Sequence, residues 1–257
     1  MPTGPEPTVT VERAVMEMHW DTLTFLHWPY DPDVIQRLLP KGLTAQTFDG
    51  EAWVSLVPFG MRITAPHAPM VPWLSTFPET NVRTYVTAPD GTEGIWFFSL
   101  DASRLAAVTF ARVSYGLPYV WSRMSFTRAG DIVTYRCLRR RGRLGGGDDG
   151  DGGGVGHDGS RASSDLAVRI GERYAPDELG PLDHFLSSRW RLYSSWHGRL
   201  LGAHARHEPW PLQRAEVLHL ADDLVLADGL PKPVGAPLAH YSETVSVRVG
   251  PPYRVVV

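Results

Sequence analysis

The stretch FPETNVRTYV, residues 77–86, brings together side chains that could carry out acid–base chemistry. At the two-residue repeat of a strand, one face carries an acid, an amide, a fixed cation and a phenol: Glu79, Asn81, Arg83 and Tyr85. The opposite face is apolar or β-branched, as in a core-facing strand. Two interpretations are open: the polar row is a solvated outer surface, which is the default in an antiparallel sheet, or it lines a pocket. In a pocket, Arg83 would keep Glu79 ionised or grip a carboxylate ligand.

Other chemistry-bearing residues give weaker signals. His204 and His207 lie three apart on an expected strand and so point to opposite sides, and we predict no metal site there. The single cysteine, Cys137, excludes an internal disulfide and is interpreted as a packing residue. Ser99 lacks the flanking glycines of a nucleophile elbow. The glycines near 145–156 lack the Lys-Ser/Thr that completes a phosphate loop.

The first half of the chain supplies the elements that would position these residues. Aromatic and β-branched runs predict strands at 23–30 and 52–61, with a helix between them that begins at the N-cap Asp31. The turn sequence APDG predicts a hairpin that contains the polar row. A helix is expected to follow, with Asp101 as its N-cap, Gly116 near its C-cap and Pro118 beyond its end.

The second half adds two strands about an RAGD turn, a short helix near GPLDHFLSSRW and further strands to the C-terminus. About ten strands joined mostly by turns indicate a mainly β (α+β) fold with a largely antiparallel sheet. Closing such a sheet into a barrel or cone removes its edges and leaves an interior that can hold a ligand.

The chain is predicted to be one domain, residues 1–257. Residues 1–12 are expected to be a loose N-terminus. Residues 139–164 are rich in Gly and Asp and are interpreted as a flexible loop between two paired strands, because β-type alternation resumes directly afterwards.

Composition narrows the class of protein. A net charge of −3 argues against a nucleic-acid partner. No apolar run approaches the roughly 20 residues that a membrane helix needs, and the N-terminus does not resemble a signal peptide. We therefore expect a cytoplasmic protein without a membrane partner. The only lysines are Lys41 and Lys232, which limits amine chemistry to two places.

The segments LTFLHWPYDPDVIQRLLPKGL, FDGEAWVSLVPFGM, ETNVRTYV, GIWFFSLDASRLAAVTFARVSYGLPY and HEPWPL resemble, in order and spacing, the YqjF-like bacterial family. That family is similar to a remote branch of the acetoacetate decarboxylase-like superfamily. The resemblance implies an antiparallel, cone-shaped β-barrel with an internal cavity. It also implies that Glu79 corresponds to an acidic residue of the decarboxylase site.

In the decarboxylase, a lysine directly after a Gly-aromatic-Pro turn forms a Schiff base. The equivalent turn here is Gly116-Leu117-Pro118, and Tyr119 takes the lysine position, so the resemblance implies that Schiff-base chemistry is lost. Glu79 and Tyr119 remain as catalytic candidates. The substrate-binding candidates are Arg83, Asn81, Tyr85, Arg112 and Arg123.

Two functions remain open at this stage. One is a small-molecule-binding β-barrel that performs acid–base chemistry on a carboxylate- or keto-bearing metabolite without a cofactor. The alternative is a ligand-binding or sensor protein without turnover. A homo-oligomer is compatible with either function.

Overall fold

The computed structural model describes residues 6–64, 75–105, 114–140 and 161–257. Strands dominate it, and they run as follows: β1 Met16–Tyr30, β2 Thr44–Ala45, β3 Thr47–Phe48, β4 Glu51–Thr64, β5 Thr76–Thr87, β6 Glu93–Ala102, β7 Tyr119–Ala129, β8 Ile132–Arg139, β9 Ser163–Arg173, β10 Arg191–Trp196, β11 Arg199–His207, β12 Gln213–Asp222, β13 Leu238–Val249 and β14 Tyr253–Arg254. The helices are short: α1 Pro32–Leu38, the 3₁₀ turn η1 Pro176–Glu178, α4 Pro181–Ser187 and α5 Leu224–Ala227. In the described ranges, no helix has the length and apolarity needed to span a bilayer.

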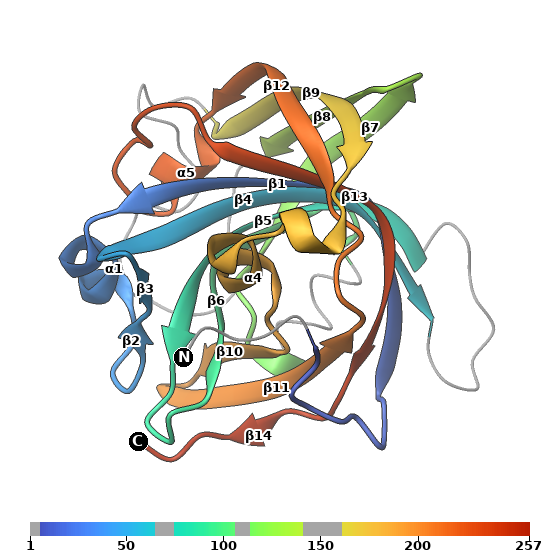
Figure 1. Cartoon of the computed structure of the whole chain (residues 1–257). Coiled ribbons are helices and arrows are strands. Elements are labelled where there is room, and N and C mark those ends of the chain that lie inside the picture. The colour runs from blue at the N-terminus through green and yellow to red at the C-terminus, as the bar shows by residue number, and fades with distance from the viewer. Residues whose placement is uncertain (1–5, 65–74, 106–113, 141–160) are drawn as a thin grey trace.

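The predicted mainly β fold is confirmed, but the sheet closes on itself twice. Strands β5, β6, β10, β11, β13, β1 and β4 pair in that order, and β4 returns to β5, so they form a ring. A second ring forms because β6 also pairs with β7, which is followed by β8, β9 and β12, and β12 pairs with β13. The rings share the wall β13-β1-β4-β5-β6 (Figure 1). A single cone was expected, and the second ring is an addition to it.

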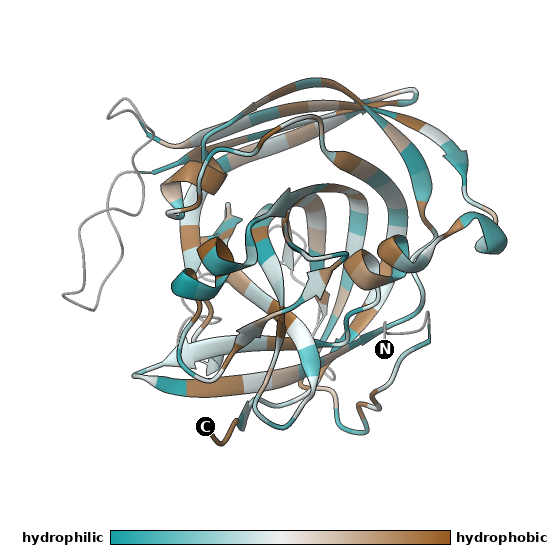
Figure 2. Cartoon of the chain, turned by 60° about the vertical axis from the view of Figure 1, so that its left-hand side comes forward, coloured by the Kyte–Doolittle hydropathy of each residue, from teal (hydrophilic) through white to brown (hydrophobic). Residues whose placement is uncertain are grey.

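The central part of the shared wall is buried on both faces, whereas Glu243 on β13 is partly exposed. Phe25 and Phe59 face one hydrophobic core inside the first ring. Leu26 and Val82 belong to a second core inside the other ring. Bands of apolar and polar residues alternate along the strands in Figure 2. In this central part, a polar side chain has no route to bulk solvent and must meet a protein group or a cavity.

Local sequence chemistry explains the elements next to this wall. Asp31 caps α1, since its Oδ1 accepts a hydrogen bond from Asp33 N at 2.8 Å, and Pro32 opens the helix as predicted. The hairpin between β5 and β6 closes through Gly91 N, which donates to Ala88 O at 2.9 Å. Most strand pairs are antiparallel, as predicted, whereas β6 pairs in parallel with both β7 and β10.

Three local predictions need correction. Asp101 is not a helix N-cap, because β6 continues through it and its side chain is fully buried. Arg139 does not belong to a solvated loop: it ends β8 and is 1% exposed. The N-terminus is partly anchored, since Val9 and Val11 are buried. Residues 141–160 of the predicted 139–164 loop lie outside the described residues, and the last two positions of that range already belong to β9.

Candidate functional site

A cavity of about 400 Å³ lies inside the first ring. This is the usual size range for a small-molecule site. Most of its wall is apolar, with Phe59, Met61, Phe77 and Phe97 among the lining residues. Three of its polar lining residues, Glu79, Asn81 and Arg83, lie on β5, and each is at most 5% exposed. The pocket interpretation of the polar row is therefore correct for these three residues.

Tyr85 continues the row but does not line the cavity. Its hydroxyl donates to Leu186 O at 2.8 Å and lies 2.7 Å from Ser55 Oγ. The ring also packs against Phe185 of α4, with 5.2 Å between centroids. Tyr85 thus holds α4 against the end of the ring, and its predicted contact with a substrate is not supported by this position.

Glu79 and Tyr119 both line the cavity and are hydrogen-bonded to each other. The Tyr119 hydroxyl donates to Glu79 Oε2 at 3.0 Å, although the residues are 40 positions apart in the chain. Two strand pairings produce this contact: β6 pairs with β5 at Glu79 and Ala102, and with β7 at Leu100 and Tyr119. The turn before Tyr119 requires glycine, because Gly116 has φ +61° and a Cβ there would lie 2.9 Å from Ser195 O.

Burial controls the protonation of this pair. It raises the pKa of Glu79 to about 8; the hydrogen bond from Tyr119 acts in the opposite direction, and the charge of Asp101 raises the pKa further. Burial, followed by the charge of Glu79, raises the pKa of Tyr119 well above 10. At neutral pH, both groups are therefore mainly uncharged.

Arg83 does not pair with Glu79, so the prediction that it keeps this carboxylate ionised is wrong. Four residues of extended strand separate their backbones by about 13 Å. Arg83 Nε is buried without a hydrogen-bond partner, and Arg83 forms no ion pair with any residue in the described ranges. Its guanidinium lies 5.3 Å from the Phe25 ring centroid. A buried, uncompensated cation on a cavity wall is a strong candidate for binding an anion.

Arg189, which was not predicted from the sequence, lines the same cavity. Its guanidinium lies 4.7 Å from the Phe185 ring centroid and 5.3 Å from that of Tyr85, and burial lowers its pKa to about 10. Arg189 Nη2 donates to Gln46 Oε1 at 3.2 Å, and Nη1 lies 3.9 Å from Glu93 Oε2. The run SSRW contains no local pattern that would have singled out this residue.

His207 also lines the cavity, where the sequence favoured a structural or exposed histidine. Its ring nitrogens lie 2.7 Å from Glu208 O and 3.0 Å from Arg189 O, and Trp210 packs on the ring at 5.0 Å. Both nitrogens are thus occupied by backbone carbonyls. Within the described residues, no group of three His, Cys, Asp or Glu side chains is placed to hold a metal ion.

Two predicted substrate contacts remain, Arg123 and Arg112. Arg123 is exposed on β7 and does not line the cavity, so this position does not support its predicted contact with a substrate. Arg112 lies outside the described residues. Lys41 and Lys232 are both exposed, which leaves no lysine among the cavity-lining residues of the described chain.

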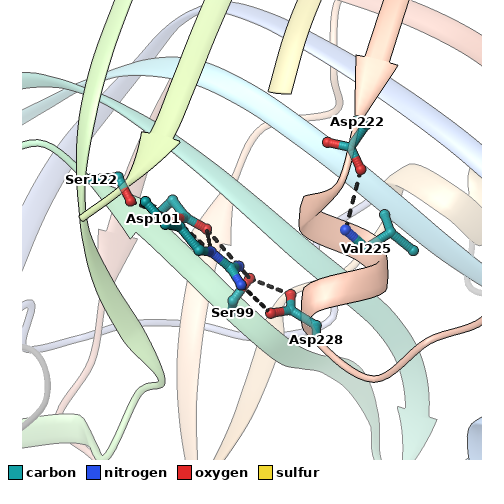
Figure 3. Close-up of polar contacts among 7 residues, drawn as sticks. Ser99, Asp101, Ser122, Asp222, Val225 and Asp228 are labelled. Carbon is teal, nitrogen blue, oxygen red and sulfur yellow. Dashed lines mark hydrogen bonds and ion pairs between the residues drawn. The ribbon is translucent and has the colours of Figure 1, made fainter. Parts of the chain in front are cut away.

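A buried ion network forms around Arg139 and includes Asp101, whose charge raises the pKa of Glu79. Arg139 donates to both Asp101 oxygens through Nε (3.0 and 3.2 Å) and to Asp101 Oδ2 through Nη2 at 2.8 Å. Its Nη1 donates to Asp228 Oδ1 at 2.8 Å, and Ser99 Oγ bridges Arg139 and Asp228. Figure 3 shows these groups around one guanidinium. Ser122 Oγ also donates to Asp101, at 2.6 Å, so the network joins β6, β7 and β8 behind Tyr119.

Comparison with known proteins places this chain in a family. Residues 17–246 match the DUF2071 family, described as an uncharacterized conserved protein. The chain is 33% identical to the uncharacterized protein YqjF of Bacillus subtilis over 238 residues, which is 92% of this chain and 91% of YqjF.

Solved structures show the fold. An acetoacetate decarboxylase-like enzyme from Sphingomonas wittichii matches with a TM-score of 0.62 and 13% identity, over 97% of this chain and 96% of that one. The enduracididine biosynthesis enzyme MppR complexed with pyruvate matches with a TM-score of 0.63 and 14% identity, over 99% and 95% of the two chains. This chain therefore belongs to the YqjF-like DUF2071 family and has the acetoacetate decarboxylase-like fold.

Proposed function

We propose that this protein binds a small organic acid in the first-ring cavity and performs acid–base chemistry on it without a Schiff base. The observation that carries the proposal is the presence of an uncompensated Arg83 and a neutral Glu79–Tyr119 pair on one apolar cavity. A carboxylate on Arg83 would supply the missing counter-ion and leave the rest of the ligand among apolar side chains. The pyruvate complex of MppR, which has the same fold, supports a keto acid as the ligand class.

Glu79 is the proposed base. A group with a pKa of about 8 is ionised in a minor fraction of molecules at neutral pH, and in that form it is a strong base. It would remove a proton from the carbon next to a ketone while Arg83 holds the carboxylate. Tyr119 is a positioning residue, since its hydroxyl orients Glu79 and stabilises the ionised form.

Proton exchange tests this chemistry directly. We expect the protein to accelerate exchange of the C3 protons of 2-oxohexanoate in D₂O, followed by NMR, with a rate that rises with pH and levels off above about pH 8. Glu79→Gln should reduce the rate at least about 100-fold, the usual contribution of a general base. Tyr119→Phe should retain part of the rate and move the inflection to higher pH, because the hydrogen bond that lowers the pKa of Glu79 is lost.

Two results would count against the proposal. If the exchange rate of Tyr119→Phe depends on pH in the same way as that of wild type, Tyr119 does not act on Glu79 as proposed. Binding of 2-oxohexanoate without any exchange would favour the second candidate, a ligand sensor. The observation that favours a sensor is the replacement of the nucleophilic lysine by Tyr119, with both lysines of the chain on the surface.

A further inference from the structure

The cavity has a polar and an apolar end. On β5, the lining changes from Arg83 through Glu79 to Phe77. On the neighbouring β4, Phe59 lies opposite Glu79, and Met61 lies opposite Phe77. On β1, Trp20 and Met18 pair with Met61 and Ile63. The three adjacent strands therefore all become apolar in the direction that leads away from Arg83.

We propose that the cavity binds an elongated apolar monocarboxylate, with its carboxylate at Arg83 and its chain along the apolar end formed by Met16, Met18, Met61, Ile63 and Phe77. This inference rests on the carboxylate site of the proposed function. Six strand residues, or about 20 Å of backbone, separate Phe77 from Arg83. A two- or three-carbon acid held at Arg83 would leave the apolar end unfilled.

The size and make-up of the cavity agree with such a ligand. At about 30 Å³ for a water-sized group, 400 Å³ holds roughly a dozen non-hydrogen atoms. Three of the six methionines of the chain lie at the apolar end. Methionine side chains are unbranched and adapt to flexible apolar ligands better than branched residues do.

Chain length is the variable that tests this inference. Calorimetric titration at pH 6.5 with butanoate, hexanoate, octanoate and decanoate should show affinity rising about fourfold for each added methylene, until the chain fills the cavity. Arg83→Met should weaken every member of the series by at least about tenfold.

A pair of variants tests where the alkyl chain of the ligand lies in the cavity. Met61→Phe narrows the apolar end of the cavity. In this variant, affinity should stop rising at an acid that is at least two carbons shorter than in wild type. The affinity for butanoate should change less than about threefold. Met124→Phe is the matched control, because Met124 packs at the edge of the second core and not in the cavity. It should leave the series unchanged.

The outcomes separate this inference from the proposed function. If short acids bind through Arg83 but affinity does not depend on the length of their alkyl chain, the inference of an elongated ligand is wrong. The carboxylate site at Arg83 is then still supported. If affinity rises with length equally in wild type and Arg83→Met, the acids partition non-specifically and the inference fails. If no acid binds in an Arg83-dependent way, both proposals fail.

Discussion

Arg139→Met is expected to destabilise the protein by about 3–5 kcal/mol, the usual cost of leaving a buried charge without its partner. Arg139 and Asp101 are both at most 1% exposed, and Asp228 is 6% exposed. Removing the guanidinium would leave two buried carboxylates facing one another. In thermal unfolding, this corresponds to a midpoint lowered by roughly 6–20 °C for a chain of this size.

Arg136→Met is the matched control for this measurement. Arg136 lies on the same strand, and its ion pair with Asp165 is exposed, with side-chain exposures of 69% and 42%. Such pairs contribute at most about 1 kcal/mol. Adding Asp101→Asn to Arg139→Met should recover part of the lost stability, because it removes one uncompensated charge. Equal losses in Arg139→Met and Arg136→Met would show that the network does not stabilise the fold.

Glu79→Gln is expected to change how stability depends on pH. The folded-state pKa of Glu79, about 8, lies above its ordinary value of 4.5, so the folded state binds the extra proton between these values. The contribution of Glu79 is fully present below about pH 4.5 and is lost as pH rises through 8. Stability of the wild type relative to Glu79→Gln should therefore fall by up to about 1.4 kcal/mol per pH unit across this window.

Urea unfolding of wild type and Glu79→Gln at pH 5, 6, 7 and 8 measures this difference in the free energy of unfolding. The contributions of most other titrating groups are the same in the two proteins and cancel. Glu51→Gln serves as the control, since Glu51 is exposed at the start of β4 and should not alter the slope. A constant difference between wild type and Glu79→Gln from pH 5 to 8 would mean that Glu79 is ionised in the folded protein, which contradicts the proposed acid–base role.

Much of the fold follows from local sequence signals. The Asp31 cap, the APDG hairpin and the alternation in residues 77–86 all correspond to the observed elements. Alternation alone could not decide whether the polar face of β5 met solvent or a cavity. That choice depends on a second ring, which buries Val82 and leaves Glu79 and Arg83 to face inward.

Long-range contacts explain what the sequence did not reveal. Arg139 meets Asp101 and Asp228 across 38 and 89 positions, so its composition-based assignment to a Gly-rich loop missed the burial. Arg189 lines the cavity beside the Tyr85 ring, and Tyr85 also holds α4 through Leu186 O, across about 100 positions of the chain. The raised pKa of Glu79 likewise arises from burial by strands distant in the chain, whereas the neighbouring Arg83 had suggested the opposite direction.

The central claim is that Arg83 selects a carboxylate ligand in the cavity. Calorimetric titration of 2-oxohexanoate and the uncharged 2-hexanone into wild type and Arg83→Met at pH 6.5 tests it most directly. The structure predicts that wild type binds the acid at least about tenfold more tightly than the ketone, and that Arg83→Met abolishes this preference. Equal affinity for acid and ketone in wild type, no binding of the acid, or an acid preference that survives in Arg83→Met would contradict the claim.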